Sequence, residues 1–133
     1  MSVAESRAVV QRLVGDFLNK HDLSVADEIF ADDLIDHQSG ADAVGRGNVK
    51  QFVGALFNAF PDLRCEIAQL IAEGDMICAY VIGRGTHRGE FRGVAPTGRS
   101  VTIYGTSVMR VAEGKIAERW NVTDIDGLMR QLA

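Results

Sequence analysis

The 133-residue sequence contains little cysteine and proline and has no long apolar run. Its two cysteines, Cys65 and Cys78, form no CxxC pair and are too few for a zinc motif or a disulfide framework. No apolar run approaches the roughly 18 residues that a membrane-spanning helix needs. These absences exclude a small disulfide scaffold and a protein anchored by a transmembrane helix.

Basic residues are also few. The sequence has 14 Lys and Arg against 18 Asp and Glu, which gives a net charge of -4, and the basic residues form no run. Binding to nucleic acid depends on clustered Lys and Arg that neutralise phosphates, so we expect no nucleic-acid partner. Near the N-terminus, charged residues such as Glu5, Arg7 and Arg12 interrupt the apolar positions, so this segment lacks the core of a signal peptide. We therefore expect a cytoplasmic protein with no membrane partner.

The first half of the chain has the apolar spacing of helices. Hydrophobic residues make up 47% of the sequence, and no repeat or linker divides residues 1–133, which we interpret as a single domain. The 3.6-residue spacing predicts three amphipathic helices, between Ser2 and Leu18, between Ser24 and Ala31, and between Asn48 and Phe60. The aromatic residues of this half that we expect to face the core are Phe17, Phe30, Phe52 and Phe57.

From Leu63 the pattern changes to the alternation of strands. Four segments, 63–73, 75–87, 99–111 and 115–124, are joined in sequence and predict an antiparallel meander, and residues 32–38 are a candidate for a further short strand. The residues after Thr123 have room for one or two helical turns. Helices first and strands afterwards predict an α+β fold in which three helices cover one face of a curved antiparallel sheet.

The last two strands predict a pocket beneath the helices. If they pair about the turn Glu113-Gly114, Ala112 lies opposite Lys115 and Ile103 lies opposite Asp124. Trp120, Val122 and Asp124 would then share the inner, more apolar face with Ile103, and Gly105 would leave space beside them. The predicted wall of this pocket consists of Trp120, Val122, Ile103, Phe17, Phe30, Phe52 and Phe57.

Asp124 has two interpretations at this point. A carboxyl in a poorly solvated hollow can exchange protons with a substrate near neutral pH. An Asp at the exit of a strand can instead cap a helix that begins near Ile125.

Several short motifs resemble one known family. GTHRGEF stands at Gly85–Phe91, PTGR at Pro96–Arg99, and GKI at Gly114–Ile116 is followed by Glu118, Trp120 and Asp124. In this order they resemble the SnoaL-like polyketide cyclase (ester cyclase) family over essentially the whole chain. The resemblance implies a nuclear transport factor 2-like cone, in which a strongly curved antiparallel sheet and helices enclose an apolar pocket, usually in a homodimer.

The resemblance also implies a reaction. The best-known members close a ring by an intramolecular aldol reaction on a hydrophobic carbonyl compound, without a cofactor, and an acid on the last strand is the general acid/base. The matching position here is Asp124, but the histidine that some cyclases carry on the same face is replaced by Val122. We therefore expect His37 and His87 as candidate helpers, and no metal or other cofactor, because no His/Asp/Glu cluster has ligand spacing.

Two further expectations concern partners. The ligand is expected to be a small hydrophobic molecule, which a non-catalytic binding or dimerisation module of the same fold would also accept. The outer face of the sheet is expected to form a homodimer, because its predicted residues are only mildly polar: Tyr104, Thr106, Val108, Asn121 and Thr123.

Overall fold

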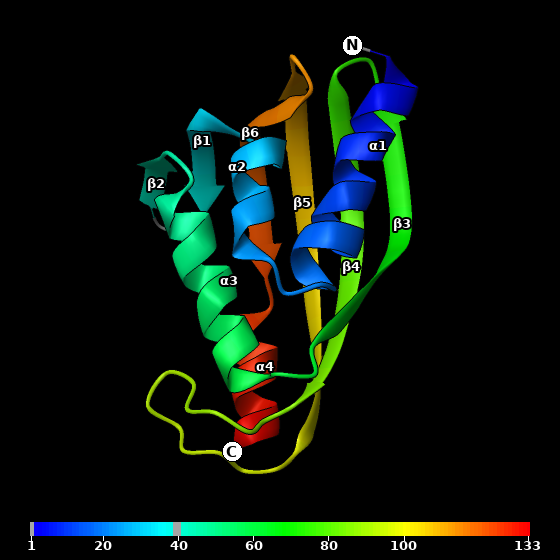
Figure 1. Ribbon diagram of the computed structural model, residues 1–133. Coiled ribbons are helices and arrows are strands. Elements are labelled where there is room, and N and C mark those ends of the chain that lie inside the picture. The colour runs from blue at the N-terminus through cyan, green and yellow to red at the C-terminus, as the bar shows by residue number, and fades with distance from the viewer. Residues whose placement is uncertain (1, 39–40) are drawn as a thin grey trace.

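The computed structural model describes residues 2–38 and 41–133 and has the predicted α+β order, with helices first and most of the sheet afterwards (Figure 1). The first helix, α1 (Val3–Arg12), begins at Ser2, whose hydroxyl accepts a hydrogen bond from the Glu5 amide at 3.1 Å. It continues as a π-helical segment, η1 (Leu13–Leu18). A 3₁₀ turn, η2 (Leu23–Val25), leads into the short α2 (Ala26–Ile29), and α3 (Gly47–Ala59) ends just before Pro61.

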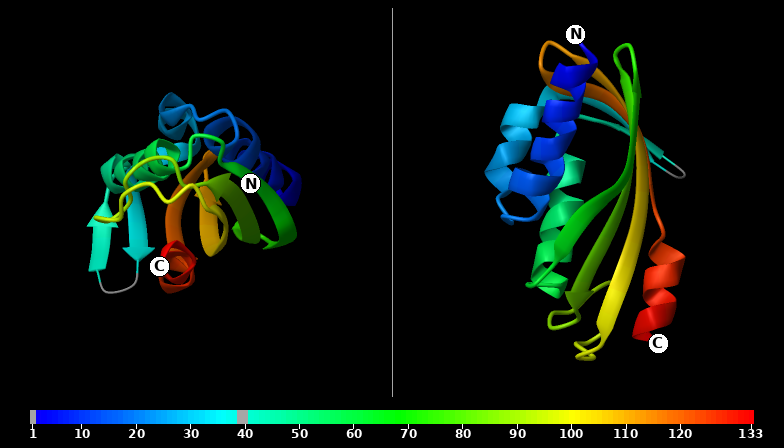
Figure 2. Two further views of the ribbon diagram at one scale, coloured as in Figure 1. Left: turned by 90° about the horizontal axis from the view of Figure 1, so that it is seen from below. Right: turned by 90° about the vertical axis from the view of Figure 1, so that its right-hand side faces the viewer.

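The sheet has six described strands in the order β2-β1-β6-β5-β4-β3. Their bounds are β1 (Phe30–Gln38), β2 (Ala41–Val44), β3 (Arg64–Glu73), β4 (Met76–Thr86), β5 (Ser100–Ala112) and β6 (Lys115–Thr123). The last four form the predicted meander, but β1 lies parallel to β6, so the prediction of a wholly antiparallel sheet is wrong. The sheet twists and bends without curling strongly, which corrects the expected strongly curved cone (Figure 2).

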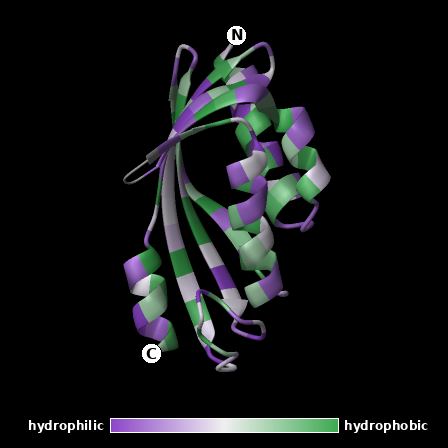
Figure 3. Ribbon diagram, turned by 90° about the vertical axis from the view of Figure 1, so that its left-hand side faces the viewer, coloured by the Kyte–Doolittle hydropathy of each residue, from purple (hydrophilic) through white to green (hydrophobic). Residues whose placement is uncertain are grey.

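Helices α1, α2 and α3 lie together on one side of the sheet (Figure 2). Buried residues of α1, η1, α3 and the inner face of β4 and β5 contribute to the main hydrophobic core, which includes Val10, Phe17, Val53, Ile77 and Met109. Figure 3 shows the alternation of hydrophilic and hydrophobic residues along the long strands, as expected for a sheet that is covered on one face. No helix in the described ranges is long and apolar enough to cross a membrane.

A fourth helix, α4 (Ile125–Leu132), lies on the other side of the sheet from α1 and α3, beside the part of β5 that β6 does not reach (Figure 2). The side-chain amide of Gln131 pairs with both backbone groups of Thr102, donating to its carbonyl and accepting from its N–H, each at 2.8 Å. Gln131 thereby satisfies backbone groups of β5 that a longer β6 would otherwise bond.

A β-bulge in β6 decides which side chains face the helices. Ala112 pairs with Lys115 as predicted, and Val111 pairs with Ile116, but Arg110 pairs with Glu118, so Ala117 is an extra residue in β6. Because side chains alternate, one extra residue moves every following side chain to the opposite face.

The predicted inner face of β6 is therefore wrong. Trp120 and Val122 are 40% and 59% exposed on the outer face, whereas Arg119 is only 7% exposed on the inner face. The predicted inner face of β5 holds, since Val101, Ile103, Ser107 and Met109 are all buried.

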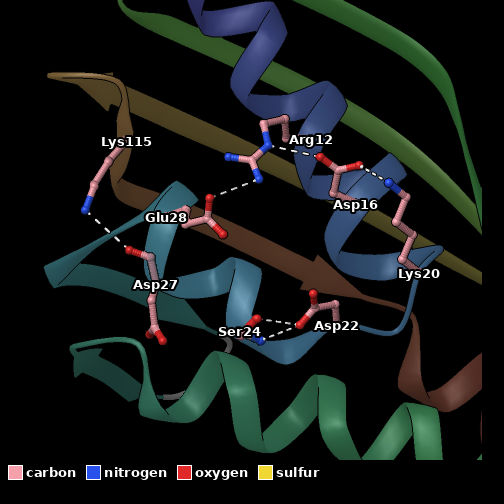
Figure 4. Close-up of polar contacts among 8 residues, drawn as sticks. All are labelled: Arg12, Asp16, Lys20, Asp22, Ser24, Asp27, Glu28 and Lys115. Atoms are coloured by element: carbon pink, nitrogen blue, oxygen red, sulfur yellow. Dashed lines mark hydrogen bonds and ion pairs between the residues drawn. The ribbon is translucent and has the colours of Figure 1, made fainter.

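Surface ion pairs lie along α1 and η1 and connect α1 to α2 (Figure 4). Arg12 contacts Asp16 at 3.0 Å and Glu28 of α2 at 3.3 Å, and Lys20 contacts Asp16 at 3.1 Å. Exposed pairs of this kind contribute about 0–1 kcal/mol each, so this network adds little to the stability of the fold.

Candidate functional site

A cavity of about 110 Å³ lies between the helices and the inner face of the sheet. Its helix side is apolar and consists of Leu13, Phe17, Leu18, Val49, Phe52, Val53 and Leu56. Its sheet side mixes small or apolar residues, among them Ala79, Val81, Gly83, Ile103 and Gly105, with the polar Ser107, Arg119, Asn121 and Thr123. The cavity thus suits a hydrophobic ligand that also carries polar atoms.

Arg119 places its positively charged guanidinium at the wall of this cavity. It forms a bidentate ion pair with Asp36 of β1, Nε to Oδ1 at 2.8 Å and Nη2 to Oδ2 at 3.1 Å. Asp36 is fully buried and also accepts from the amide of Gln38 at 3.0 Å, while the guanidinium lies 5.6 Å from the centre of the Phe30 ring. Since Asp36 and Arg119 are register partners, the parallel pairing of β1 with β6 creates this pair.

Three smaller polar residues continue the wall beyond Arg119. Asn121 and Thr123 follow on β6, and Ser107 of β5 is the register partner of Asn121. The amide of Asn121 donates a long hydrogen bond to the Thr123 hydroxyl at 3.4 Å, and the buried Ser107 hydroxyl has no partner among the described residues.

Cys65 also lines the cavity, but it is a poor nucleophile. Burial raises the pKa of its thiol to about 11, so the thiol stays protonated at neutral pH. Both cysteines are free.

The residues that the sequence assigned to the pocket divide into three groups. Phe17, Phe52 and Ile103 line the cavity. Phe30 and Phe57 lie one layer behind it, where their rings contact Phe17 at centroid distances of 6.1 and 6.4 Å. Trp120 and Val122 lie on the opposite face because of the bulge, so their assignment to the pocket is wrong.

Asp124 is exposed and caps α4. Its carboxylate accepts a hydrogen bond from the Gly127 amide at 2.9 Å, and its backbone amide donates to the Tyr104 carbonyl at 2.8 Å. The apolar surroundings predicted for Asp124 are therefore wrong, so its acid/base role now depends on the family resemblance alone.

His37 lies on the outer face of the sheet, away from the cavity. Its imidazole contacts Glu118 at 2.7 Å and Asp42 at 3.0 Å, and it stacks on Trp120 with a centroid distance of 5.0 Å. The hydrogen bonds to Glu118 and then to Asp42 raise the pKa of His37, and the hydrogen bond from His37 lowers the pKa of Glu118.

This cluster predicts a pH-dependent stability. The contribution of Glu118 is present above its ordinary pKa of 4.5 and is lost as the pH falls through its lowered value. The contribution of protonated His37 is present below its ordinary pKa of 6.5 and is lost as the pH rises through its raised value. We expect the stabilisation by this pair to be complete between these two ordinary values.

Denaturant unfolding of wild type and His37→Gln at pH 6 and pH 9 tests this expectation. The difference in unfolding free energy between the two proteins should be larger at pH 6. A difference that does not change with pH would contradict it.

His87 is fully buried where the loop 87–99 begins and does not line the cavity. Its Nδ1 accepts a hydrogen bond from the Thr97 amide at 3.1 Å, and its backbone bonds Arg99 and Gly98 across the loop. With Nδ1 as acceptor, the ring proton is on Nε2, which is buried without a partner among the described residues, near the Phe60 ring. The contacts of His87 are those of a residue that holds the loop closed.

A second, more open cleft of about 530 Å³ lies between β2, α3 and this loop. Its wall carries several side-chain amides and charges, including Gln38, Asn48, Gln51, Asn58 and Arg92. Phe52 lines both this cleft and the inner cavity, so the two are neighbours.

The sequence did not point to Arg119, Asp36, Ser107 or Asn121. A buried Arg–Asp pair leaves no mark in a single sequence when its members lie 83 residues apart. Within residues 2–38 and 41–133, no three His, Cys, Asp or Glu side chains converge as ligands for a metal.

Comparison with known proteins agrees with this architecture. The chain matches the family described as SnoaL-like polyketide cyclase over residues 8–132. Nogalonic acid methyl ester cyclase of Streptomyces nogalater is 31% identical over 83 residues, which span 62% of this chain and 62% of that protein's length.

Two solved structures are similar over nearly the whole chain. AclR of Streptomyces galilaeus, provisionally assigned as a hydroxylase, has a TM-score of 0.90 and 30% identity, covering 98% of this chain and 82% of AclR. IdmH of Streptomyces antibioticus, provisionally assigned as a polyketide cyclase, has a TM-score of 0.82 and 27% identity, covering 96% and 97%. The chain therefore belongs to the SnoaL-like polyketide cyclase family.

Proposed function

We propose that this protein is an enzyme that binds a hydrophobic carbonyl compound, polycyclic ones included, in the inner cavity and catalyses ring closure or a related proton transfer without a cofactor. The buried Arg119–Asp36 pair supports this proposal most directly, because a fixed guanidinium in a largely apolar cavity stabilises an oxygen that gains negative charge. The similarity to a cyclase named for nogalonic acid methyl ester makes that aromatic ester the first candidate substrate.

In the proposed reaction Asp36 and Arg119 each have one role. The carbon beside a carbonyl loses a proton to the Asp36 carboxylate, and its electron pair moves onto the carbonyl oxygen, which accepts hydrogen bonds from Arg119. The enolate carbon then bonds to a second carbonyl carbon of the same molecule, and the new alkoxide takes the proton back. The product is an isomer of the substrate, so the step needs no oxidant or reductant.

Asp36 is assigned as the proton acceptor because it is hydrogen-bonded to a side chain of the cavity wall. A substrate oxygen that bonds Arg119 competes with Asp36 for the guanidinium and frees the carboxylate. The exposed Asp124 has no comparable contact with the cavity.

Asp36→Asn and Asp124→Asn form a matched pair of variants. We expect Asp36→Asn to lower kcat/KM for nogalonic acid methyl ester by on the order of a hundredfold or more, because the amide cannot accept the proton. We expect Asp124→Asn to keep the activity within about twofold and to lose about 1 kcal/mol or less of stability, because Asn caps helices nearly as well as Asp.

Melting curves must show that both variants are folded at the assay temperature. Arg119→Lys is a further check, because it keeps the charge but loses the bidentate geometry, and its turnover should also fall. A large rate loss in Asp124→Asn with full activity in Asp36→Asn would instead return the acid/base role to Asp124.

One observation favours a non-catalytic binding module as the second candidate. Among the described residues that line the cavity there is no carboxylate and no histidine. If the wild type binds such esters with no turnover and Asp36→Asn binds them equally well, the protein is a binder.

We also propose a homodimer that forms through the outer face of the sheet. The bulge exchanges the expected Asn121 and Thr123 of this face for Trp120 and Val122, which lie on the same face as the 41%-exposed Tyr104. The face is thus more apolar than expected, and a second copy of the chain would cover it. Light scattering at micromolar concentration should give a dimer for the wild type and a monomer for Val122→Lys. A monomeric wild type would refute the dimer.

A further inference from the structure

The polar groups of the inner cavity lie along one side. Leu13, Phe17, Phe52 and Leu56 belong to its entirely apolar helix side. The polar wall residues of β6 stand at alternate positions, 119, 121 and 123. A ligand held between these surfaces meets hydrocarbon along one edge and hydrogen-bonding groups along the other.

The spacing of this polar row follows from strand geometry. Two residues along a strand are separated by roughly 7 Å, so the backbone positions of Arg119 and Asn121 are about that far apart. The Asn121 amide has both donors and an acceptor, and its Nδ2 donates a long hydrogen bond of 3.4 Å to the Thr123 hydroxyl. Two ligand oxygens on one edge, separated by a similar distance, could therefore bond Arg119 and Asn121 together.

Ser107 provides an independent observation at the same place. It is 7% exposed, it lines the cavity beside its register partner Asn121, and its hydroxyl has no hydrogen-bond partner among the described residues. Burial of a hydroxyl without a partner is unfavourable, and a bound ligand oxygen would supply the missing hydrogen bond.

We propose that the cavity selects ring compounds that carry two oxygens on one edge, the first bound by Arg119 and the second by Asn121 with Ser107. The inference rests on the proposed function, in which Arg119 receives a substrate oxygen, and adds the second oxygen and its placement. The opposite, oxygen-free edge of the ring contacts Phe17 and Leu56. A ligand larger than the cavity extends past Phe52 toward the neighbouring cleft.

Two isomers of dihydroxynaphthalene test this placement with equal size and composition. The 2,7-isomer has both oxygens on one long edge, and the 2,6-isomer has them on opposite edges. By isothermal titration calorimetry, the wild type should bind the 2,7-isomer about tenfold more tightly, because one misplaced oxygen leaves buried polar groups unpaired.

Two variants assign this preference to the second oxygen site. Asn121→Leu should reduce the preference to less than about twofold, and Ser107→Ala should reduce it in part without lowering the melting temperature, because Ala removes an unpaired hydroxyl. Ile71→Ala, on β3, 66% exposed and outside the cavity lining, serves as the control and should keep the full preference.

The outcomes separate this inference from the proposed function. Equal binding of both isomers by the wild type, or a preference that survives in both Asn121→Leu and Ser107→Ala, overturns the two-oxygen selection and leaves the ligand cavity in place. Failure of both isomers and of naphthalene itself to bind overturns the cavity as a ligand site, and the proposed function with it.

Discussion

Arg119→Met is expected to destabilise the protein by about 3–5 kcal/mol, because it leaves Asp36 as a buried carboxylate without its ionic partner. Asp36 has no exposed surface, so removal of the guanidinium leaves two hydrogen bonds of a buried carboxylate unmade. Urea unfolding, followed by the fluorescence of Trp120, the one tryptophan of the chain, measures this loss.

Two further variants test whether the loss of stability depends on the burial of the pair and on the charge left unpaired. Arg84→Met removes one partner of the exposed Arg84–Glu66 pair, which has the same 2.8 Å distance, and should cost less than about 1 kcal/mol. The double variant Asp36→Leu/Arg119→Met should be more stable than Arg119→Met alone, since it leaves no unpaired charge. A loss below about 1 kcal/mol for Arg119→Met would show that the pair is not sealed from water.

Phe17→Ala is expected to cost about 3–5 kcal/mol and to enlarge the inner cavity. Phe17 has no exposed surface, and its ring contacts Phe30 and Phe57 edge-on. Because the missing ring borders a largely apolar cavity, benzene should bind the enlarged space and raise the melting temperature of the variant more than that of the wild type.

Phe57→Ala is the control for this second prediction. Phe57 is only partly buried and does not line the cavity, so its removal should cost less and should create no benzene site. An equal response of both variants to benzene, or a melting temperature of Phe17→Ala close to that of the wild type, would contradict the prediction.

The sequence by itself determined the elements and much of the core. Helical spacing placed Phe17 and Phe52 on buried faces, because amphipathic periodicity is local and survives in the folded state. Alternation in β5 placed Ile103 on the inner face for the same reason. The ordered motifs near the C-terminus pointed to the family, which the match over residues 8–132 confirms.

Only the tertiary structure decided the composition of the site. The single extra residue Ala117 reversed the faces of the rest of β6, bringing Arg119 and Asn121 inside and turning Trp120 outward. A bulge shifts the alternation without changing the pattern of residue types, so a regular hairpin described the same sequence equally well. The Asp36–Arg119 pair depends on the parallel pairing of β1 with β6, a contact across 83 residues that no local pattern encodes, because long-range pairing is fixed by how the whole chain packs.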